Sequence, residues 1–320
     1  MAHLIETNQI TKKAEIAYIG KKPWHGLGQE LTPNASIEVW QKEAGLDWSA
    51  KLAPVLYTPD ILPIPYKDRF VIYRNDTNNP LGIVTDRYQI HQPQQILDFF
   101  NTLVNSAGFT LEVAGAIKGG KRIWALANVN KEACVFGDDV VKAYLLLSTS
   151  FDGSMATIGQ FTSVRVVCNN TLNAADNEIT PSRISISHGQ EFNHFKMRDK
   201  LGIMVNGFDG MMDSYRRLAN ESVNKNFVHD FLTKLFPPIY NEIKHTFILS
   251  SGYNKVFDLF DGKGMGSDLP HVYGTKWGLL NAVTEHIDHE RGHNVDNRIN
   301  NAWFGNGARV KNLAEKLLLA

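Results

Sequence analysis

The spacing of hydrophobic and polar positions changes along the chain, and between residues 69 and 164 it is typical of β-strands. Apolar residues there alternate with polar or small ones in short runs that end in turn-forming residues, the pattern of half-buried strands. We predict strands over 70–73, 81–84, 109–117, 123–129, 140–150 and 155–164. The last four are joined by short turns at Gly119–Gly120, Gly137–Asp139 and Asp152–Gly153, which favours an antiparallel meander.

Helical spacing appears before, between and after these strands. A short helix is predicted over 35–44, after Asn34 and before Gly45, because a capping residue and a stop residue enclose an apolar face. Pro93 opens a second helix that ends at Gly108. Beyond residue 190 the apolar residues recur with a period of about 3.6. That period predicts helices over 195–212, 227–235, 239–249, 275–290 and 306–319.

These patterns predict an α+β protein in three consecutive parts. Four prolines between residues 54 and 65 permit edge strands or turns and exclude a helix interior, so we place a boundary near 60–66. The first part, 1–65, is an N-terminal extension with a short helix. The second, 66–190, is an α+β core with an antiparallel β-meander and flanking helices, and the third, 191–320, is a helical C-terminal region.

Composition narrows the class of protein. With 43% hydrophobic residues in 320, the chain can bury a core, and its 33 basic residues equal its 33 acidic ones. Any nucleic-acid binding must therefore come from a local basic patch. Glu6 interrupts a signal-peptide pattern and no apolar run is long enough for a membrane span. Cys134 and Cys168 form no CxxC motif, which favours a reducing cytoplasm and excludes a disulfide framework.

Four stretches resemble a family of uncharacterised phage, prophage and plasmid proteins that share a domain of unknown function. The resemblance spans most of the chain, from about residue 20 to the C-terminus, and implies a mobile-element protein in the cytoplasm of a bacterial host. It implies no reaction, and by analogy with other mobile-element proteins it points to nucleic acid. The stretches are PWHGLG at 23–28, LGIVTDRYQI at 81–90, RVVCNNTLNAA at 165–175 and GTKWGLLNAVTEHIDH at 274–289.

A basic hairpin tip is the candidate DNA-binding site. Lys118, Lys121 and Arg122 surround Gly119–Gly120, so three cations could contact phosphates where the main chain approaches closely. Trp124 is a candidate stacking platform for unpaired bases. The order of helix, meander and basic hairpin also resembles in outline the ring-forming single-strand annealing proteins, which would place Arg165 in the same groove. The structural alternative is that the tip is a solubilising turn.

A second hypothesis is a zinc metallohydrolase. His289, Glu290 and His293 match the H-E-x-x-H pattern, in which two histidines on one helix face bind zinc and the glutamate acts as general base. Glu315 is the candidate third ligand. Gly292 and the polar residues before His289 oppose this reading. The alternative is a charged, solvated helix end.

The remaining hypotheses concern Cys168 and protein partners. Cys168 follows Arg165 by three positions, so a cation could activate it as a nucleophile, although an isolated cysteine in an apolar segment is more often a buried small hydrophobe. Exposed aromatics such as Trp24 and Trp303 would suit a module that binds a host protein. We favour a non-enzymatic, cofactor-free and homo-oligomeric protein that binds or anneals single-stranded DNA.

Overall fold

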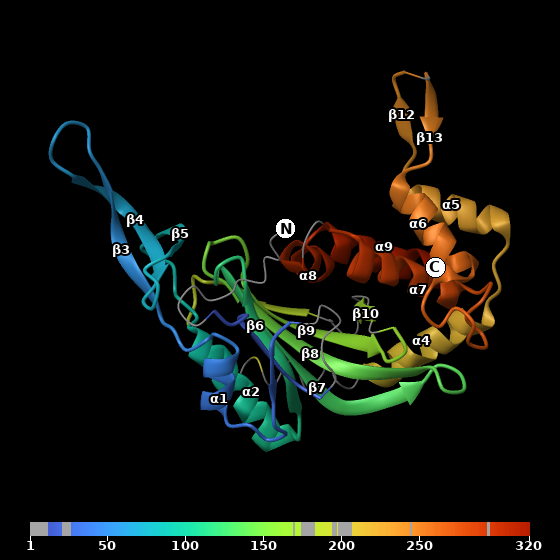
Figure 1. The fold of residues 1–320 in the computed structure, drawn as a ribbon, viewed down its shortest axis with the longest axis horizontal. Helices are drawn as coiled ribbons and strands as arrows, with labels where there is room; N and C mark the ends of the chain where they lie inside the picture. The colour runs from blue at the N-terminus through green and yellow to red at the C-terminus, as the bar shows by residue number, and fades with distance from the viewer. Residues whose placement is uncertain are drawn as a thin grey trace. The chain divides into compact units, whose positions relative to one another are not determined.

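The structure of the protein is a computed structural model (Figure 1). The described residues are 12–20, 27–168, 170–173, 183–193, 197, 207–243, 245–292 and 295–320. They divide into two compact units that interleave along the sequence: 1–130, 144–161 and 183–203 form the first, and 131–143, 162–182 and 204–320 form the second. The three consecutive parts predicted from the sequence stay a prediction.

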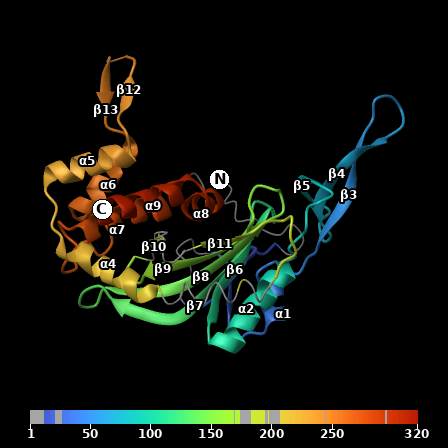
Figure 2. The ribbon, with the colours of Figure 1, turned by 180° about the vertical axis from the view of Figure 1, so that it is seen from behind.

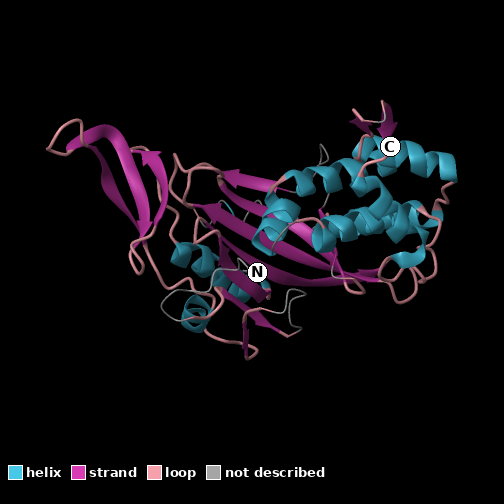
Figure 3. Ribbon diagram, turned by 45° about the horizontal axis from the view of Figure 1, so that its top comes forward, coloured by secondary structure: helices cyan, strands magenta, loops and turns pink. Residues whose placement is uncertain are grey.

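The fold is α+β, as the sequence predicts (Figure 3). The largest sheet has eight strands within the described residues, in the order β10-β9-β8-β7-β6-β1-β2, with β11 paired to β9. Because β6 to β9 are neighbours in chain order, the predicted meander is confirmed. The strands are β1 Ile16–Ile19, β2 Gln29–Leu31, β6 Thr110–Ile117, β7 Arg122–Cys134, β8 Val140–Ser150, β9 Thr157–Arg165, β10 Asn170–Asn173 and β11 Arg183–Ile186.

The turn between β6 and β7 is longer than predicted. The last strand pair is Ile117 with Arg122, so the loop has four residues where the glycine pair predicts two. Lys118, Gly119 and Gly120 all have positive φ, at 54°, 73° and 85°. A side chain at Gly120 would also lie 3.0 Å from the Trp48 ring. The close approach of that ring explains why this position is a glycine.

A separate three-stranded antiparallel sheet contains the proline-rich stretch. It consists of β3 Ala50–Tyr57, β4 Ile64–Arg74 and β5 Pro80–Thr85, and the predicted hairpin over 70–84 is confirmed. The pairing of β3 with β4 shifts between Pro54 and Leu56. Such an irregularity accommodates a residue that cannot donate to the ladder. We call the hairpin from Ala50 to Arg69 the β3–β4 arm.

The helices of the first unit contact strands β1 and β6 of the large sheet (Figure 2). Helix α1, Ile37–Glu43, begins after Ser36 and contacts β1 and α2. Asn34 is not its cap, because its φ of 65° turns the chain before the helix starts. Helix α2, Pro93–Ala107, ends at Gly108 with φ of 68°, so its predicted start and stop are confirmed.

The second unit is mostly helical. Its helical segments are α4 Phe208–Asn220, α5 Lys225–Leu235, α6 Ser251–Asp258, η1 Leu259–Lys263, α7 Lys276–Glu285, η2 His286–Glu290, α8 Val295–Phe304 and α9 Asn306–Leu319. The helices predicted over 227–235, 275–290 and 306–319 are confirmed. The predicted segment 195–212 lies largely outside the described residues before α4. Every residue of α7 from Trp277 to Glu285 is buried, so α7 is a core helix, and it contacts α4 and α9.

The predicted helix over 239–249 is wrong. Residues there form the hairpin of β12, Ile239–Asn241, and β13, Thr246–Ile248. Aromatic and β-branched residues dominate both strands, and such residues favour strands where an apolar run is too short for its period to decide. No helix in the described part of the chain is long and apolar enough to cross a membrane.

Candidate functional site

The basic hairpin tip is partly exposed and is tied to neighbouring turns of the first unit. Lys118, Lys121 and Arg122 are each of intermediate exposure. The Arg122 guanidinium donates to Ser154 Oγ at 2.9 Å, and the carbonyl of Lys121 accepts a hydrogen bond from the Phe151 amide at 2.8 Å. The tip therefore presents less free cationic surface than its sequence suggests.

Two residues assigned to the same DNA groove are buried. Trp124 is 2% exposed and Arg165 is fully buried. An indole enclosed in the core cannot stack on a base that arrives from solvent, and Arg165 carries a carboxylate partner of its own. This placement corrects the expectation that Trp124 and Arg165 form part of a DNA-binding surface.

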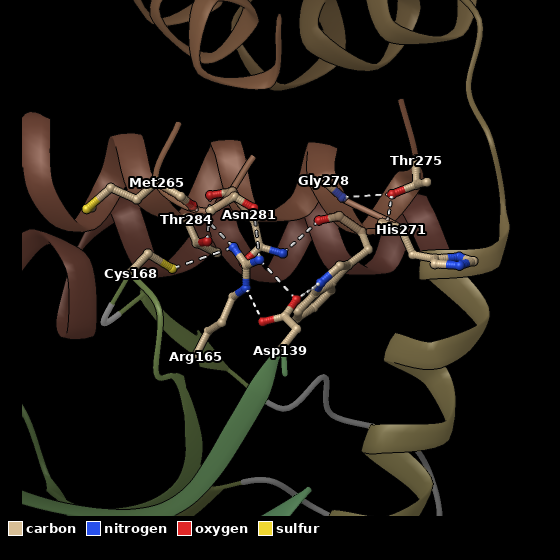
Figure 4. A network of polar contacts seen from close by, with 11 residues as sticks. Asp139, Arg165, Cys168, Met265, His271, Thr275, Gly278, Asn281 and Thr284 are labelled. Atoms are coloured by element: carbon tan, nitrogen blue, oxygen red, sulfur yellow. Dashed lines mark hydrogen bonds and ion pairs between the residues drawn. The ribbon is translucent and has the colours of Figure 1, made fainter. Parts of the chain in front are cut away.

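Arg165 is instead the centre of a polar network inside the second unit (Figure 4). Its Nε and one terminal nitrogen donate to the two carboxylate oxygens of Asp139 at 2.6 and 2.9 Å. The indole of Trp277 donates to the same carboxylate at 2.9 Å. The guanidinium also donates to the carbonyls of Met265 and Gly266, at 3.4 and 3.3 Å. The network joins the end of β9, the turn before β8, helix α7 and the loop after η1.

The electrostatics of this network favour a permanent ion pair. Burial lowers the pKa of Arg165, but the hydrogen bonds to Asp139 and the charges nearby outweigh it, so that the net pKa lies above the ordinary value. Cys168 is 2% exposed and its Sγ lies 3.8 Å from an Arg165 nitrogen. This burial agrees with the interpretation of Cys168 as a buried small hydrophobe rather than a nucleophile.

A second buried cluster lies in the same unit, where the Asp288 carboxylate joins η2 to β10 and α9. Asp288 accepts from both the amide and the hydroxyl of Thr171, at 2.7 and 2.6 Å, and from the Lys311 ammonium at 2.7 Å. Lys311 also donates to the Thr171 hydroxyl at 3.1 Å. The indole of Trp303 donates to that hydroxyl at 3.3 Å, so Trp303 is a half-buried structural residue and not a free surface aromatic.

The helix that the zinc hypothesis requires ends too early. Segment η2 stops at Glu290, Arg291 is extended, and Gly292 has φ of 132°. His293 lies outside the described residues, so its distance to His289 is not defined. The Glu290 carboxylate, the proposed general base, instead contacts His286 Nδ1 at 3.0 Å.

The proposed third zinc ligand faces a different partner. Glu315 is 4% exposed and acts electrostatically on Tyr215, whose pKa is raised first by burial and then by this charge. Within the described residues, no group of three or more His, Cys, Asp or Glu side chains is arranged to hold a metal ion. Zinc binding stays a prediction.

The β3–β4 arm is an exposed feature that the sequence reading missed. All residues from 56 to 69 are exposed, and Ile61 and Leu62 near its tip are 89% and 75% exposed. Tyr57 and Tyr66, about half exposed, form an edge-to-face pair with ring centroids 6.2 Å apart. The arm also carries the exposed cations Lys51, Lys67 and Arg69. The available signal was the run of prolines followed by Tyr66, Lys67 and Arg69, whereas the prolines alone favour a boundary there.

These observations define an α+β protein whose second unit is held together by two buried ionic clusters. Residues 80–312 match the model of a family described as a domain of unknown function, DUF932, and the chain belongs to that family. No curated protein and no solved structure matches the chain. The matched region includes both ionic clusters, whereas β3 and β4 precede it.

Proposed function

We propose that the protein belongs to a mobile genetic element, acts in the bacterial cytoplasm, and binds single-stranded DNA through the β3–β4 arm as a homo-oligomer. The observation that carries the proposal is the exposed Tyr57–Tyr66 pair, on an arm that also carries the exposed cations Lys67 and Arg69. The sequence resemblance to phage and plasmid proteins supports the genetic context.

The geometry of the arm suits unpaired bases. Tyr57 pairs with Ile64 across the hairpin, and strand side chains alternate between faces, so Tyr57, Ile64 and Tyr66 share one face. An aromatic and apolar face of this kind can stack on bases, each stacked base contributing about 1–3 kcal/mol.

The charge of the arm favours single strands over a duplex. The arm carries the cations Lys51, Lys67 and Arg69 and the carboxylates Asp60 and Asp68. Its small net positive charge gives little binding free energy from duplex phosphates alone. Unpaired bases add stacking on the exposed tyrosines, which a duplex does not offer. With three phosphate contacts at most, the logarithm of the binding constant should fall with the logarithm of salt concentration with a slope of about −2.

The test is fluorescence anisotropy of labelled single-stranded and double-stranded oligonucleotides at two salt concentrations. A Tyr57→Ala, Tyr66→Ala double variant should bind single strands roughly tenfold or more weakly, because two stacking platforms are lost. Tyr240→Ala is the matched control, since Tyr240 is an equally exposed tyrosine of the β12–β13 hairpin.

A second double variant separates the arm from the β6–β7 tip. If Lys121→Ala with Arg122→Ala abolishes binding while the arm variants bind normally, DNA binds at the tip. Absence of binding to any oligonucleotide at low salt overturns the proposal. Sedimentation velocity of the same proteins tests the oligomer: a monomer for the wild-type chain contradicts the homo-oligomeric part.

A further inference from the structure

A cavity of about 690 Å³ lies within the second unit, and its wall contains an oriented histidine. His286 lines the cavity and is 8% exposed. Its Nδ1 is 3.0 Å from Glu290 Oε2, so the carboxylate fixes the proton on Nδ1 and leaves Nε2 for a further partner. No residue in the described part of the chain forms a hydrogen bond with that Nε2.

Two cations line the same cavity. Lys255, on α6, and Arg291, directly after η2, both belong to its wall, and neither has an ion-pair partner among the residues that the structure describes. Both lie close enough to His286 to act on it. Burial is the largest cause of the lowered pKa of His286; the contact with Glu290 raises that pKa, and the charges of Arg291 and Lys255 lower it further.

The composition of the wall indicates the chemistry of a ligand. The wall contains two cations and one carboxylate, so the cavity carries a net positive charge. The carboxylate, Glu290, already contacts His286. Phe236 and Val310 provide an apolar side. A volume of about 690 Å³ lies within the range of about 300–1,000 Å³ that is usual for small-molecule sites. A ligand with an anionic group and an organic body fits all of these features.

We propose that this cavity binds an organic phosphate monoester, with Lys255 and Arg291 holding the phosphate and His286 Nε2 hydrogen-bonded to one of its oxygens. Arginine and lysine are the usual phosphate-binding residues, and their charge-assisted hydrogen bonds are the strong ones. The apolar side takes the organic body. The site does not depend on DNA binding by the β3–β4 arm.

The same chemistry has two sources, a free nucleotide and the 5′-terminal phosphate of a DNA strand. Isothermal titration calorimetry of the full chain should therefore use thymidine monophosphate, thymidine, and short oligonucleotides with and without a 5′-phosphate. Binding of the monophosphate without binding of thymidine supports the site. Tighter binding of the 5′-phosphorylated oligonucleotide than of either thymidine monophosphate or the unphosphorylated strand identifies a DNA end; the reverse identifies a free nucleotide.

Charge variants test the assigned residues. Arg291→Gln and Lys255→Gln should each weaken binding by roughly tenfold or more, the loss expected for one charge-assisted hydrogen bond. Lys316→Gln removes an exposed charge of α9 outside the cavity wall and should leave affinity unchanged.

Protonation gives a readout that a purely structural role would not change. A phosphate beside Nε2 favours the protonated imidazole, so the NMR-measured pKa of His286 should rise when thymidine monophosphate binds. The groups that face this ring are Glu290, Arg291, Lys255 and Phe236. No binding of any phosphate compound at millimolar concentration overturns the proposal, as does an equal loss of affinity in Lys316→Gln. Arm variants that lose DNA binding leave this outcome unaffected.

Discussion

Arg165 and Asp139 form a two-bond ion pair from which solvent is excluded: the side chains are 0% and 2% exposed. Asp139 also accepts the indole N–H of Trp277, so its carboxylate has three donors. Removing a charge from such a pair leaves the other charge buried without compensation, which costs far more than the intact pair contributes.

We predict that Arg165→Met lowers the free energy of unfolding by about 3–5 kcal/mol, because the Asp139 carboxylate is left buried. Urea denaturation measures the loss. The matched control is Lys142→Met, which breaks the exposed pair with Glu132 at 3.6 Å and should cost less than about 1 kcal/mol. The double variant Arg165→Met, Asp139→Leu should recover part of the stability. Equal losses in the two single variants would contradict a special role for the buried pair.

The Asp288 cluster predicts a graded series of losses. Lys311→Met leaves Asp288 buried without its cation and should cost about 3–5 kcal/mol. Thr171→Val preserves the shape and the ion pair and removes the hydroxyl alone, so a smaller loss of about 1–3 kcal/mol is expected. Denaturation curves of both variants give the order. If Thr171→Val costs more than Lys311→Met, the lysine is not the main partner of the carboxylate.

Local signals explain which parts of the fold the sequence could predict. The helix from Pro93 to Ala107 and the turn at Gly119–Gly120 depend on residues adjacent in the chain, and both formed with small differences. Arg165 shows what local signals cannot predict. A cation after a strand is compatible with DNA binding. No local pattern reveals that Asp139, 26 positions away, and Trp277 lie next to it in the core.

The candidate sites show the same division between local and long-range information. The H-E-x-x-H letters at 289–293 require one continuous helix, and the extended Arg291 interrupts it. The pairing of His286 with Glu290 is local, at i and i+4, but His286 was not a candidate because the cavity beside it depends on α5, α6 and α9 meeting there. The β3–β4 arm was missed for a similar reason. The four prolines there are compatible with either a boundary or a hairpin, and the pairing of β3 with β4, which makes it a hairpin, is not a local signal.

Gly278 gives a prediction whose sign is opposite to helix propensity. It lies in the first turns of α7, and a Cβ there would overlap the carbonyl oxygen of Val272. Gly278→Ala should therefore destabilise the protein by about 1–3 kcal/mol through overpacking, despite a propensity gain of up to about 1 kcal/mol. Thermal unfolding measures this change. Gly210→Ala is the control, because its Cβ would meet open space in α4 and should be neutral or stabilising.

Two buried histidines of the first unit predict how stability depends on pH. His91 Nε2 donates to the Gln190 carbonyl at 2.8 Å, and its Nδ1 is hydrogen-bonded to Thr157 Oγ1 at 2.6 Å. The His91 ring lies against that of His188. Burial is the main cause that lowers the pKa of both rings below the ordinary value of 6.5. The folded state then binds fewer protons than the unfolded state below about pH 6.5, so their contribution to stability is present at higher pH and is lost as the pH falls.

The protein should therefore unfold at a lower temperature at about pH 5.5 than at about pH 7.5, and the decrease should be smaller in His91→Gln, which removes one of the two groups. His91→Gln also loses hydrogen bonds, so the quantity to compare is the change in melting temperature between the two pH values, not the melting temperature itself. His245→Gln is the control, since His245 is exposed and should retain the wild-type decrease. If His91→Gln shows the full decrease, the ring already accepts its proton in the folded state and other groups set the pH dependence.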